Sequence, residues 1–364
     1  MDAPSCPASL LAAERRRFPW WVLCGAVLIP CLYLPTIGTG FDFTDDGNLV
    51  YPAPSMSLPQ RLALVWEKIE ANVEDLGPFR PVLWAHWEFA AELYRGNAFC
   101  WRLGRLGWSM FAAGAFLWLL RELRIRPAAA LAAVALAMWN PYRNEIWTSL
   151  TLGEGVAMPY ALLGLACAVQ AGRSGRPLGW DLLGAACVLA ALGCKNTFAA
   201  LVPAQMFLRL APDGRLTWEA WRLRGRAALL LSLTLLLPVG HFVYFKTHWH
   251  PGQYTPGGPS ASQLGHYLIA LQGAVSLEFI GLGVVLTLVA LAAYQRSLWA
   301  GGSRVVALGA ALWRTAGRYR AALGAGALLL LGGVAEYLPM NAIAGRYTMP
   351  AVWGLDIALA VLLS

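Results

Sequence analysis

The chain has 364 residues, of which 58% are hydrophobic and only 13% are charged. Soluble domains carry about a quarter charged residues, so this composition excludes an ordinary soluble domain. The net charge of +8 comes from arginines that stand between apolar runs, which is typical of a membrane protein and argues against nucleic-acid binding. The seven cysteines are scattered and form no Cys-x-x-Cys pair, so we expect neither a disulfide framework nor a zinc site.

The apolar runs predict an all-α polytopic membrane protein with about ten transmembrane helices, within a range of roughly 9–12 because several runs are short. The predicted spans are residues 18–38, 98–120, 127–140, 155–171, 178–193, 196–210, 226–246, 278–295, 320–338 and 348–364. The first run resembles a signal peptide but is too long and has no small-residue cleavage site after it, so an uncleaved helix is expected. We treat residues 1–364 as a single transmembrane domain.

Arginine-rich connections alternate with connections that carry little positive charge. Eighteen of the 28 lysines and arginines lie in five connections on the side of the N-terminus. By the positive-inside rule this side is cytoplasmic. We therefore expect a multi-pass protein of a bacterial inner membrane with a cytoplasmic N-terminus. The two long outer loops, 39–97 and 246–277, would then face the periplasm.

The first outer loop contains two candidate helices. In 58–73, Leu58, Leu62, Trp66 and Ile69 form an apolar stripe at helical spacing, which predicts an amphipathic helix on the membrane surface. The segment 81–94 is a second candidate. Its histidine and two glutamates argue against a free transmembrane helix, so we expect an interfacial helix there as well.

Three aspartates, Asp42, Asp45 and Asp46, follow the first span in the stretch GFDFTDDGNLVYP. Aspartate and glycine are common in turns, so a polar helix exit is one interpretation. A second is a catalytic carboxylate that deprotonates a hydroxyl as it attacks an anomeric carbon. Carboxylates there could also help to hold a divalent cation, and the identity of any metal stays open.

Basic and polar residues at four further points also map to the outer side. They are Arg80 in FRPVLW, Arg143, Glu145 and Glu154 in WNPYRNEIWTSLTLGEG, Lys195 in LGCKNTF, and Arg346 and Tyr347 in AGRYT. Each alone has an ordinary interpretation as a snorkelling arginine, a solvated loop charge, a turn or an interfacial anchor. An isolated lysine between apolar segments is nonetheless a functional candidate. Acidic and basic groups gathered at one membrane surface suit a phosphate-bearing lipid.

In their order along the chain these motifs resemble the C-type (GT-C fold) membrane glycosyltransferases. The nearest group is that of the protein O-mannosyltransferases and their relatives that carry tetratricopeptide repeats. The resemblance covers about residues 18–355 and rests on the double aspartate, Arg80-Pro81, Lys195 and Arg346-Tyr347. It implies a multi-helix enzyme that takes a sugar from a polyprenyl-phosphate carrier on the outer face.

The resemblance also implies roles for individual residues. Asp45 or Asp46 would be the essential acidic residue, and Arg80, Lys195 and Arg346 would compete for the phosphate. Asn196 stands where the family has a glutamate, and no repeat domain follows the last span. The acceptor, whether glycan, lipid or protein, is therefore open, and acceptor recognition could rest on 246–277.

Two other classes of function stay open from the sequence. A flippase or transporter of lipid-linked sugars needs polar groups along a path through the bilayer, whereas the predicted spans are nearly uncharged. A polymerase of lipid-linked saccharides would share the chemistry of the outer face. A catalytically inactive relative is a further alternative.

The arginine distribution generates a test of sidedness. Gly258→Cys should react with a membrane-impermeant thiol reagent added to the outer side of intact cells, and Arg215→Cys should react only after the membrane is permeabilised. Mass spectrometry of the two peptides separates these sites from the native cysteines. The opposite pattern would invert the predicted topology.

Overall fold

The computed structural model describes most of the chain, and all of the elements that it describes are helices. The described residues are 19–41, 56–76, 79–248, 261–276, 280, 283, 317–337 and 348–364. No strand occurs among them, so the predicted all-α class is confirmed for this part of the chain.

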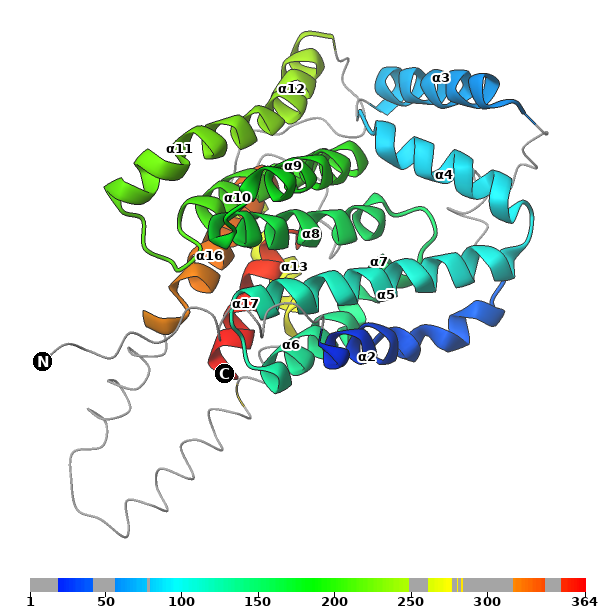
Figure 1. The fold of residues 1–364 in the computed structure, drawn as a ribbon. Coiled ribbons are helices and arrows are strands. Elements are labelled where there is room, and N and C mark those ends of the chain that lie inside the picture. The colour runs from blue at the N-terminus through cyan, green and yellow to red at the C-terminus, as the bar shows by residue number, and fades with distance from the viewer. Residues whose placement is uncertain are drawn as a thin grey trace, which may run out of the picture.

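The helices follow the predicted spans closely (Figure 1). In chain order they are α2 (Trp20–Leu28), η1 (Pro30–Gly38), α3 (Leu58–Leu76), α4 (Pro81–Tyr94), α5 (Ala98–Glu122), α6 (Pro127–Trp139), η3 (Pro141–Arg143), α7 (Asn144–Thr148), α8 (Gly153–Arg173), α9 (Pro177–Cys194), η4 (Asn196–Phe198), α10 (Leu201–Leu210), α11 (Trp218–Ser232), η5 (Leu233–Leu235), α12 (Leu236–His248), α13 (Ala261–Ala274), α16 (Arg320–Tyr337) and α17 (Ala351–Leu362). Elements labelled η are 3₁₀ helices.

Among the described residues, five helical stretches are long and apolar enough to cross a membrane. They are Trp20–Gly38, Ala98–Glu122, Gly153–Arg173, Pro177–Cys194 and Trp218–Gly240. Two shorter apolar helices, α6 and α17, accompany them. This pattern is compatible with a multi-pass α-helical membrane protein. The total of about ten crossings stays a prediction, and the span predicted at 278–295 lies outside the described residues except for 280 and 283.

Local sequence explains several helix starts. Helices α4, α6 and α9 each begin with a proline at their first position, where the missing N–H is not needed. Helix α11 begins at Trp218 rather than at the predicted residue 226, because the Thr217 hydroxyl accepts a hydrogen bond from the Ala220 N–H at 3.1 Å. Helix α10 begins later than predicted, because η4 occupies 196–198.

Helix α8 forms the centre of the bundle and packs against α5, α9 and α10. It is apolar around most of its circumference, as expected for a helix that is buried on all sides. Figure 1 shows α3 and α4 together at one edge, and contacts place α4 against α3, α5 and α9. The interfacial position predicted for α3 and α4 stays a prediction.

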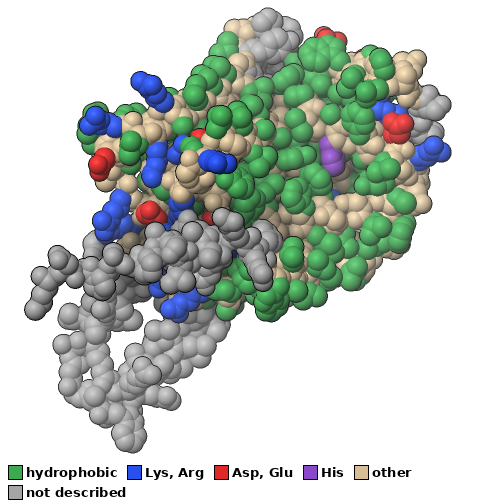
Figure 2. All heavy atoms as spheres, viewed as in Figure 1, with side chains coloured by type: hydrophobic (Ala, Val, Ile, Leu, Met, Phe, Trp, Pro, Cys, Tyr) green, Lys and Arg blue, Asp and Glu red, His purple; other side chains and the backbone are tan. Residues whose placement is uncertain are grey.

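Arginines join the connections at one end of the bundle. Arg173, in the last turn of α8, donates to the carbonyl oxygens of Glu122 and, at 2.8 Å, Pro212. Arg209 forms a two-point ion pair with Asp181, at 2.7 and 3.0 Å. Figure 2 shows most basic side chains of the visible face at this end, with a broad hydrophobic surface beside them. Positive charge thus gathers at one end of the helices, as is typical of a membrane protein.

Helices α16 and α17 cross at two glycines, which generates a packing prediction. A Cβ at Gly326 would lie 2.8 Å from the Gly354 carbonyl oxygen, whereas one at Gly179 on α9 would meet nothing within 4 Å. Gly326→Ala should therefore lower the free energy of unfolding by about 1–3 kcal/mol. Gly179→Ala, the control, should be neutral or stabilising because alanine favours helix. Denaturation in detergent measures both, and equal effects would contradict the close crossing.

Candidate functional site

The candidate site lies at the end of the bundle opposite to the arginine-rich connections. Glu154 stands in the first turn of α8, whereas Arg173 stands in its last turn. Lys195 follows the last residue of α9. The Lys195 Nζ atom lies 2.7 Å from Glu154 Oε1, and the two side chains are only 8% and 1% exposed. This is a buried ion pair between two neighbouring transmembrane helices.

Glycines allow the three helices at this end to approach. A Cβ at Gly153 would lie 2.9 Å from the Cys194 carbonyl oxygen and 3.0 Å from Leu83 of α4. A Cβ at Gly193 would lie 2.6 Å from Val82. The absence of side chains at 153 and 193 therefore lets α4, α8 and α9 converge beside Glu154.

Two arginines join the ion pair. Arg80 caps the N-terminus of α4, is half-buried, and interacts electrostatically with Glu154. Arg105 on α5 is buried, donates to the Ile146 carbonyl oxygen and also interacts electrostatically with Glu154. Its guanidinium occupies the space beside Gly155, where any side chain would collide with it.

The resulting cluster, Arg80, Arg105, Glu154 and Lys195, has more positive than negative charge. It holds three cations around one carboxylate. His86, which faces Arg105 and packs on Trp108, adds no charge at pH 7, because burial and Arg105 lower the pKa of its imidazole to about 4. The Nε atom of Arg80 is buried and has no hydrogen-bond partner among the described residues.

Other ion pairs in the described part of the chain that contain a buried member match one cation with one carboxylate. Between α3 and α4, Arg61 pairs with Glu92 and Lys68 pairs with Glu88, each at 2.5 Å. Arg143 pairs with Asp356, and Arg209 with Asp181. Unpaired charge is costly in a buried position. The three cations beside one carboxylate therefore make this cluster a candidate for binding an anion.

The described chain that leads to the acidic motif is bound by a neighbour of Arg105. Arg102 of α5 donates to the Gly40 carbonyl oxygen at 2.9 Å and to the Thr148 carbonyl oxygen at 2.6 Å. It also interacts electrostatically with Arg105. Gly40 precedes Asp42 by two residues. Asp42, Asp45 and Asp46 themselves lie outside the described residues.

Of the residues predicted for substrate binding, the structure brings Arg80 and Lys195 together around Glu154. Arg143 instead forms a buried ion pair with Asp356. Glu145 is exposed on the short helix α7. Arg346 and Tyr347 lie outside the described residues. The proposed roles of all these residues in substrate binding stay predictions.

Sequence reasoning did not select Arg105, and it grouped Glu154 with Arg143 and Glu145 as charges at the outer side without pairing it with Lys195 or Arg80. Arg105 follows Arg102 near the start of α5, where a charge has an ordinary interpretation, so nothing in the local sequence distinguished it. Glu154 was recognisable only as one charge in a short connection. Its value as the shared partner of three cations depends on contacts between α4, α5, α8 and α9.

A groove lies between α3 and α12. It has a volume of about 500 Å³ and a mainly apolar lining that includes Trp66, Ile69, Phe79 and Leu236. Glu70 and Glu74 stand at its wall. Phe79 directly precedes Arg80, so an apolar groove and a cationic cluster are adjacent in the chain. Together they suit an amphiphile with an anionic head group.

A metal site is not evident in the part of the chain that the structure describes. No group of three or more histidine, cysteine, aspartate or glutamate side chains there could hold a metal ion. The acidic motif is outside this part, so the question of a divalent cation stays open.

Comparisons of this chain with family models, curated proteins and solved structures find no match. The all-helical fold with apolar, membrane-length helices among the described residues therefore rests on the structure itself.

The excess of positive charge predicts that Glu154 and Lys195 contribute unequally to the stability of the protein. Glu154→Gln removes the only carboxylate of the cluster and should cost about 3–5 kcal/mol of unfolding free energy, the usual penalty for an uncompensated buried charge. Lys195→Met lowers the cation excess and should cost less. Denaturation of the detergent-solubilised protein measures both. A larger loss for Lys195→Met would show that the cluster is not short of negative charge.

Proposed function

We propose that this protein is a GT-C-like membrane glycosyltransferase. It transfers a hexose from a polyprenyl-phosphate-linked donor to an acceptor on the outer face of a bacterial inner membrane. In this proposal about ten helices cross the membrane, the N-terminus is cytoplasmic, and α3 and α4 lie at the outer surface. The observation that carries it is the buried excess of cations around Glu154, next to an apolar groove.

The proposed reaction has one base and one phosphate site. Asp46 or Asp45 removes the proton of the acceptor hydroxyl as its oxygen bonds to the anomeric carbon. The bond from that carbon to the phosphate oxygen breaks, and the carrier leaves with an additional negative charge. Arg80 and Lys195 stabilise this developing charge, which is the larger share of catalysis in many enzymes.

Other residues have supporting roles in the proposal. Glu154 would hold Lys195 and Arg80 in place through its negative charge, and Arg105 would add positive charge beside them. Asp42, Arg346 and Tyr347 would contact the sugar or the phosphate. The α3–α12 groove would take apolar carrier chain, because its lining is mainly apolar and lies next to Arg80. No step requires a metal, although carboxylates of the acidic motif could bind a divalent cation.

A flippase is less well supported by the same contacts. Its path needs accessible polar groups along the depth of the bundle. Arg143 and Asp356 are charged groups within the bundle, but they are 1% and 0% exposed and neutralise each other. A polymerase of lipid-linked saccharides would use the same phosphate chemistry and would differ only in its acceptor.

The proposed base is tested by Asp46→Asn and Asp45→Asn in purified protein in lipid nanodiscs. Release of polyprenyl phosphate from a polyprenyl-phosphate hexose is the measurement, because it does not depend on the acceptor's identity. We expect one of the two variants to be slower by about 10²–10⁴-fold. Asp213→Asn, which removes an exposed carboxylate at the other end of the bundle, is the control. Wild-type rates in both variants and in the double variant would reject a catalytic carboxylate there.

The phosphate site is tested by Arg80→Lys, with Arg124→Lys as the control on an exposed arginine. Lysine keeps the charge but lacks the planar fork of arginine. We expect Arg80→Lys to reduce turnover by about 10²-fold, with a smaller effect on the affinity for polyprenyl phosphate. If Arg80→Lys is fully active and Lys195→Ala is inactive, Lys195 rather than Arg80 is the residue that binds the phosphate. Full activity in both variants and in Arg346→Ala would contradict the enzyme proposal.

A further inference from the structure

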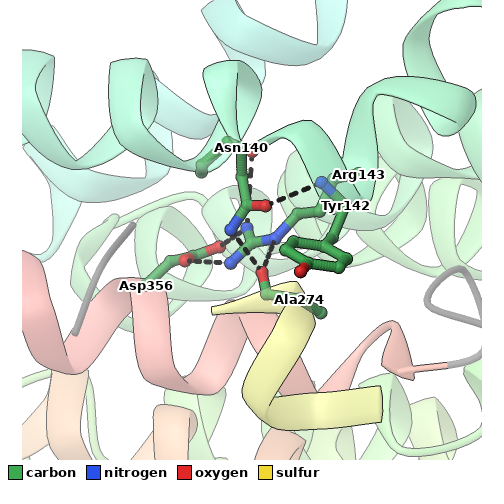
Figure 3. A network of polar contacts seen from close by, with 6 residues as sticks. Asn140, Tyr142, Arg143, Ala274 and Asp356 are labelled. Carbon is green, nitrogen blue, oxygen red and sulfur yellow. Dashed lines mark hydrogen bonds and ion pairs between the residues drawn. The ribbon is translucent and has the colours of Figure 1, made fainter. Parts of the chain in front are cut away.

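Arg143 and Asp356 form a buried ion pair that the proposed reaction does not use. The two terminal nitrogens of Arg143 donate to the two carboxylate oxygens of Asp356 at 2.8 and 3.1 Å. The residues are 213 positions apart and join η3 to α17 (Figure 3). Both side chains are almost completely buried. A buried pair of this kind is weak evidence for stability, so another role deserves consideration.

The Nε donor of the guanidinium points to a third element, helix α13. Arg143 Nε donates to the Ala274 carbonyl oxygen at 2.5 Å, and Asn140 Nδ2 donates to the same oxygen at 2.7 Å. Figure 3 shows the two donors converging on Ala274, the last residue of α13. A cation at a helix C-terminus is stabilising, because the unpaired carbonyls there are negative. Both terminal nitrogens of Arg143 bind the Asp356 carboxylate, and this orients the Nε atom toward the Ala274 carbonyl oxygen.

The C-terminal end of α13 is also held by close packing. The Tyr142 ring lies against Gly273, where a Cβ would be 3.3 Å from the nearest ring atom. Further along α13, Tyr267 is completely buried, whereas Leu268 and Ile269 are 50% and 66% exposed. Helix α13 therefore docks on the bundle with one face, and Arg143 and Asn140 secure its end.

Docking of α13 reaches the candidate site through one further residue. Tyr267 interacts electrostatically with Glu336 of α16. Glu336 Oε1 accepts a hydrogen bond from the Ala200 N–H at 2.7 Å. Ala200 belongs to the turn that starts at Lys195. Hydrogen bonds thus join Asp356, Arg143 and the end of α13, and a separate hydrogen bond joins Glu336 to the turn that carries the buried lysine. Tyr267 and Glu336 are near enough to interact electrostatically, which brings α13 close to that turn.

We propose that Arg143 and Asp356 are positioning residues: their ion pair holds α13 in its docked position, and docked α13 supports the turn of Lys195. Helix α13 is the described part of the second predicted outer loop. The docking itself is independent of the activity. Its effect on sugar transfer rests on the proposed function.

Thiol reactivity tests the docking. In Tyr267→Cys the thiol occupies a buried position, and in the matched control Leu268→Cys it is exposed. Adding Asp356→Asn, Arg143→Lys or the double change Arg143→Met with Asp356→Leu should raise the reactivity of Cys at 267 by about tenfold or more, since a hydrogen bond to a charged group is lost. Reactivity at 268 should not change. The double change removes the pair without leaving a buried charge unpaired, which keeps the bundle folded.

Hydrogen exchange of residues 261–276 repeats the comparison in proteins that keep Tyr267. Faster exchange in the three Arg143 and Asp356 variants supports the proposal. Unchanged exchange and unchanged thiol reactivity in all three variants would overturn it.

A disulfide cross-link tests whether Arg143 and Asp356 act by holding α13 in place or by contacting the substrate directly. A Cβ at Gly273 would lie 3.6 Å from Tyr142 Cγ, the position that the Sγ atom of a cysteine at 142 would occupy, so cysteines at these two positions face each other across the contact. Tyr142→Cys with Gly273→Cys, oxidised in the Asp356→Asn background, should restore slow exchange in α13 and the release of polyprenyl phosphate. Reduction should abolish both effects.

The outcomes distinguish the two proposals. Restored docking without restored release would overturn the positioning role and indicate that Arg143 or Asp356 acts on the substrate directly. If the wild-type protein releases no polyprenyl phosphate while the exchange and labelling results are as expected, the proposed function fails and the docking role is supported.

Discussion

A single carboxylate, Glu154, organises the end of the bundle that carries the candidate site. It sits in the first turn of α8, where a negative charge is favoured by the helix dipole. Cations reach it from three other elements: Arg80 from the start of α4, Arg105 from α5 and Lys195 from the end of α9. Gly153 and Gly193 make this convergence sterically possible. Without Glu154 the buried cations would repel one another, so the relative placement of four helices depends on it.

The polar groups of the bundle fall into two physical types. Closed pairs, such as Arg209 with Asp181, satisfy their charges internally and join elements. The cluster around Glu154 does not balance its charges within the described residues, and its most accessible member, Arg80, keeps a buried donor without a partner. A closed pair is suited to holding structure, whereas an unbalanced cluster is suited to binding an anion. This difference is the reason for placing the function at Glu154 and a positioning role at Arg143.

The sequence predicted the helices well because hydrophobic length and periodicity are local properties. The bounds of α4 were predicted at 81–94, and Lys195 was predicted at a turn because no single helix needs so long an apolar run. The pairing of Arg143 with Asp356 was not predictable, because the partners are 213 residues apart and nothing local records their contact. Arg105 was missed for the same reason: its charge has meaning only beside Glu154. The three aspartates were identified by their local pattern, and the structure adds that Arg102 holds Gly40, which precedes them.

The charge of the cluster also bears on how the proposed reaction would be accelerated. One carboxylate offsets one of the three cations, which leaves an excess of two positive charges. A polyprenyl-phosphate sugar is a phosphodiester with a single negative charge, whereas the departing polyprenyl phosphate gains a second. An excess of two positive charges is therefore matched better by the leaving group than by the intact donor. Interactions that strengthen as the bond breaks lower the barrier, whereas interactions equal in both states only improve binding. A second carboxylate among the described groups of the cluster would shift this match toward the intact donor.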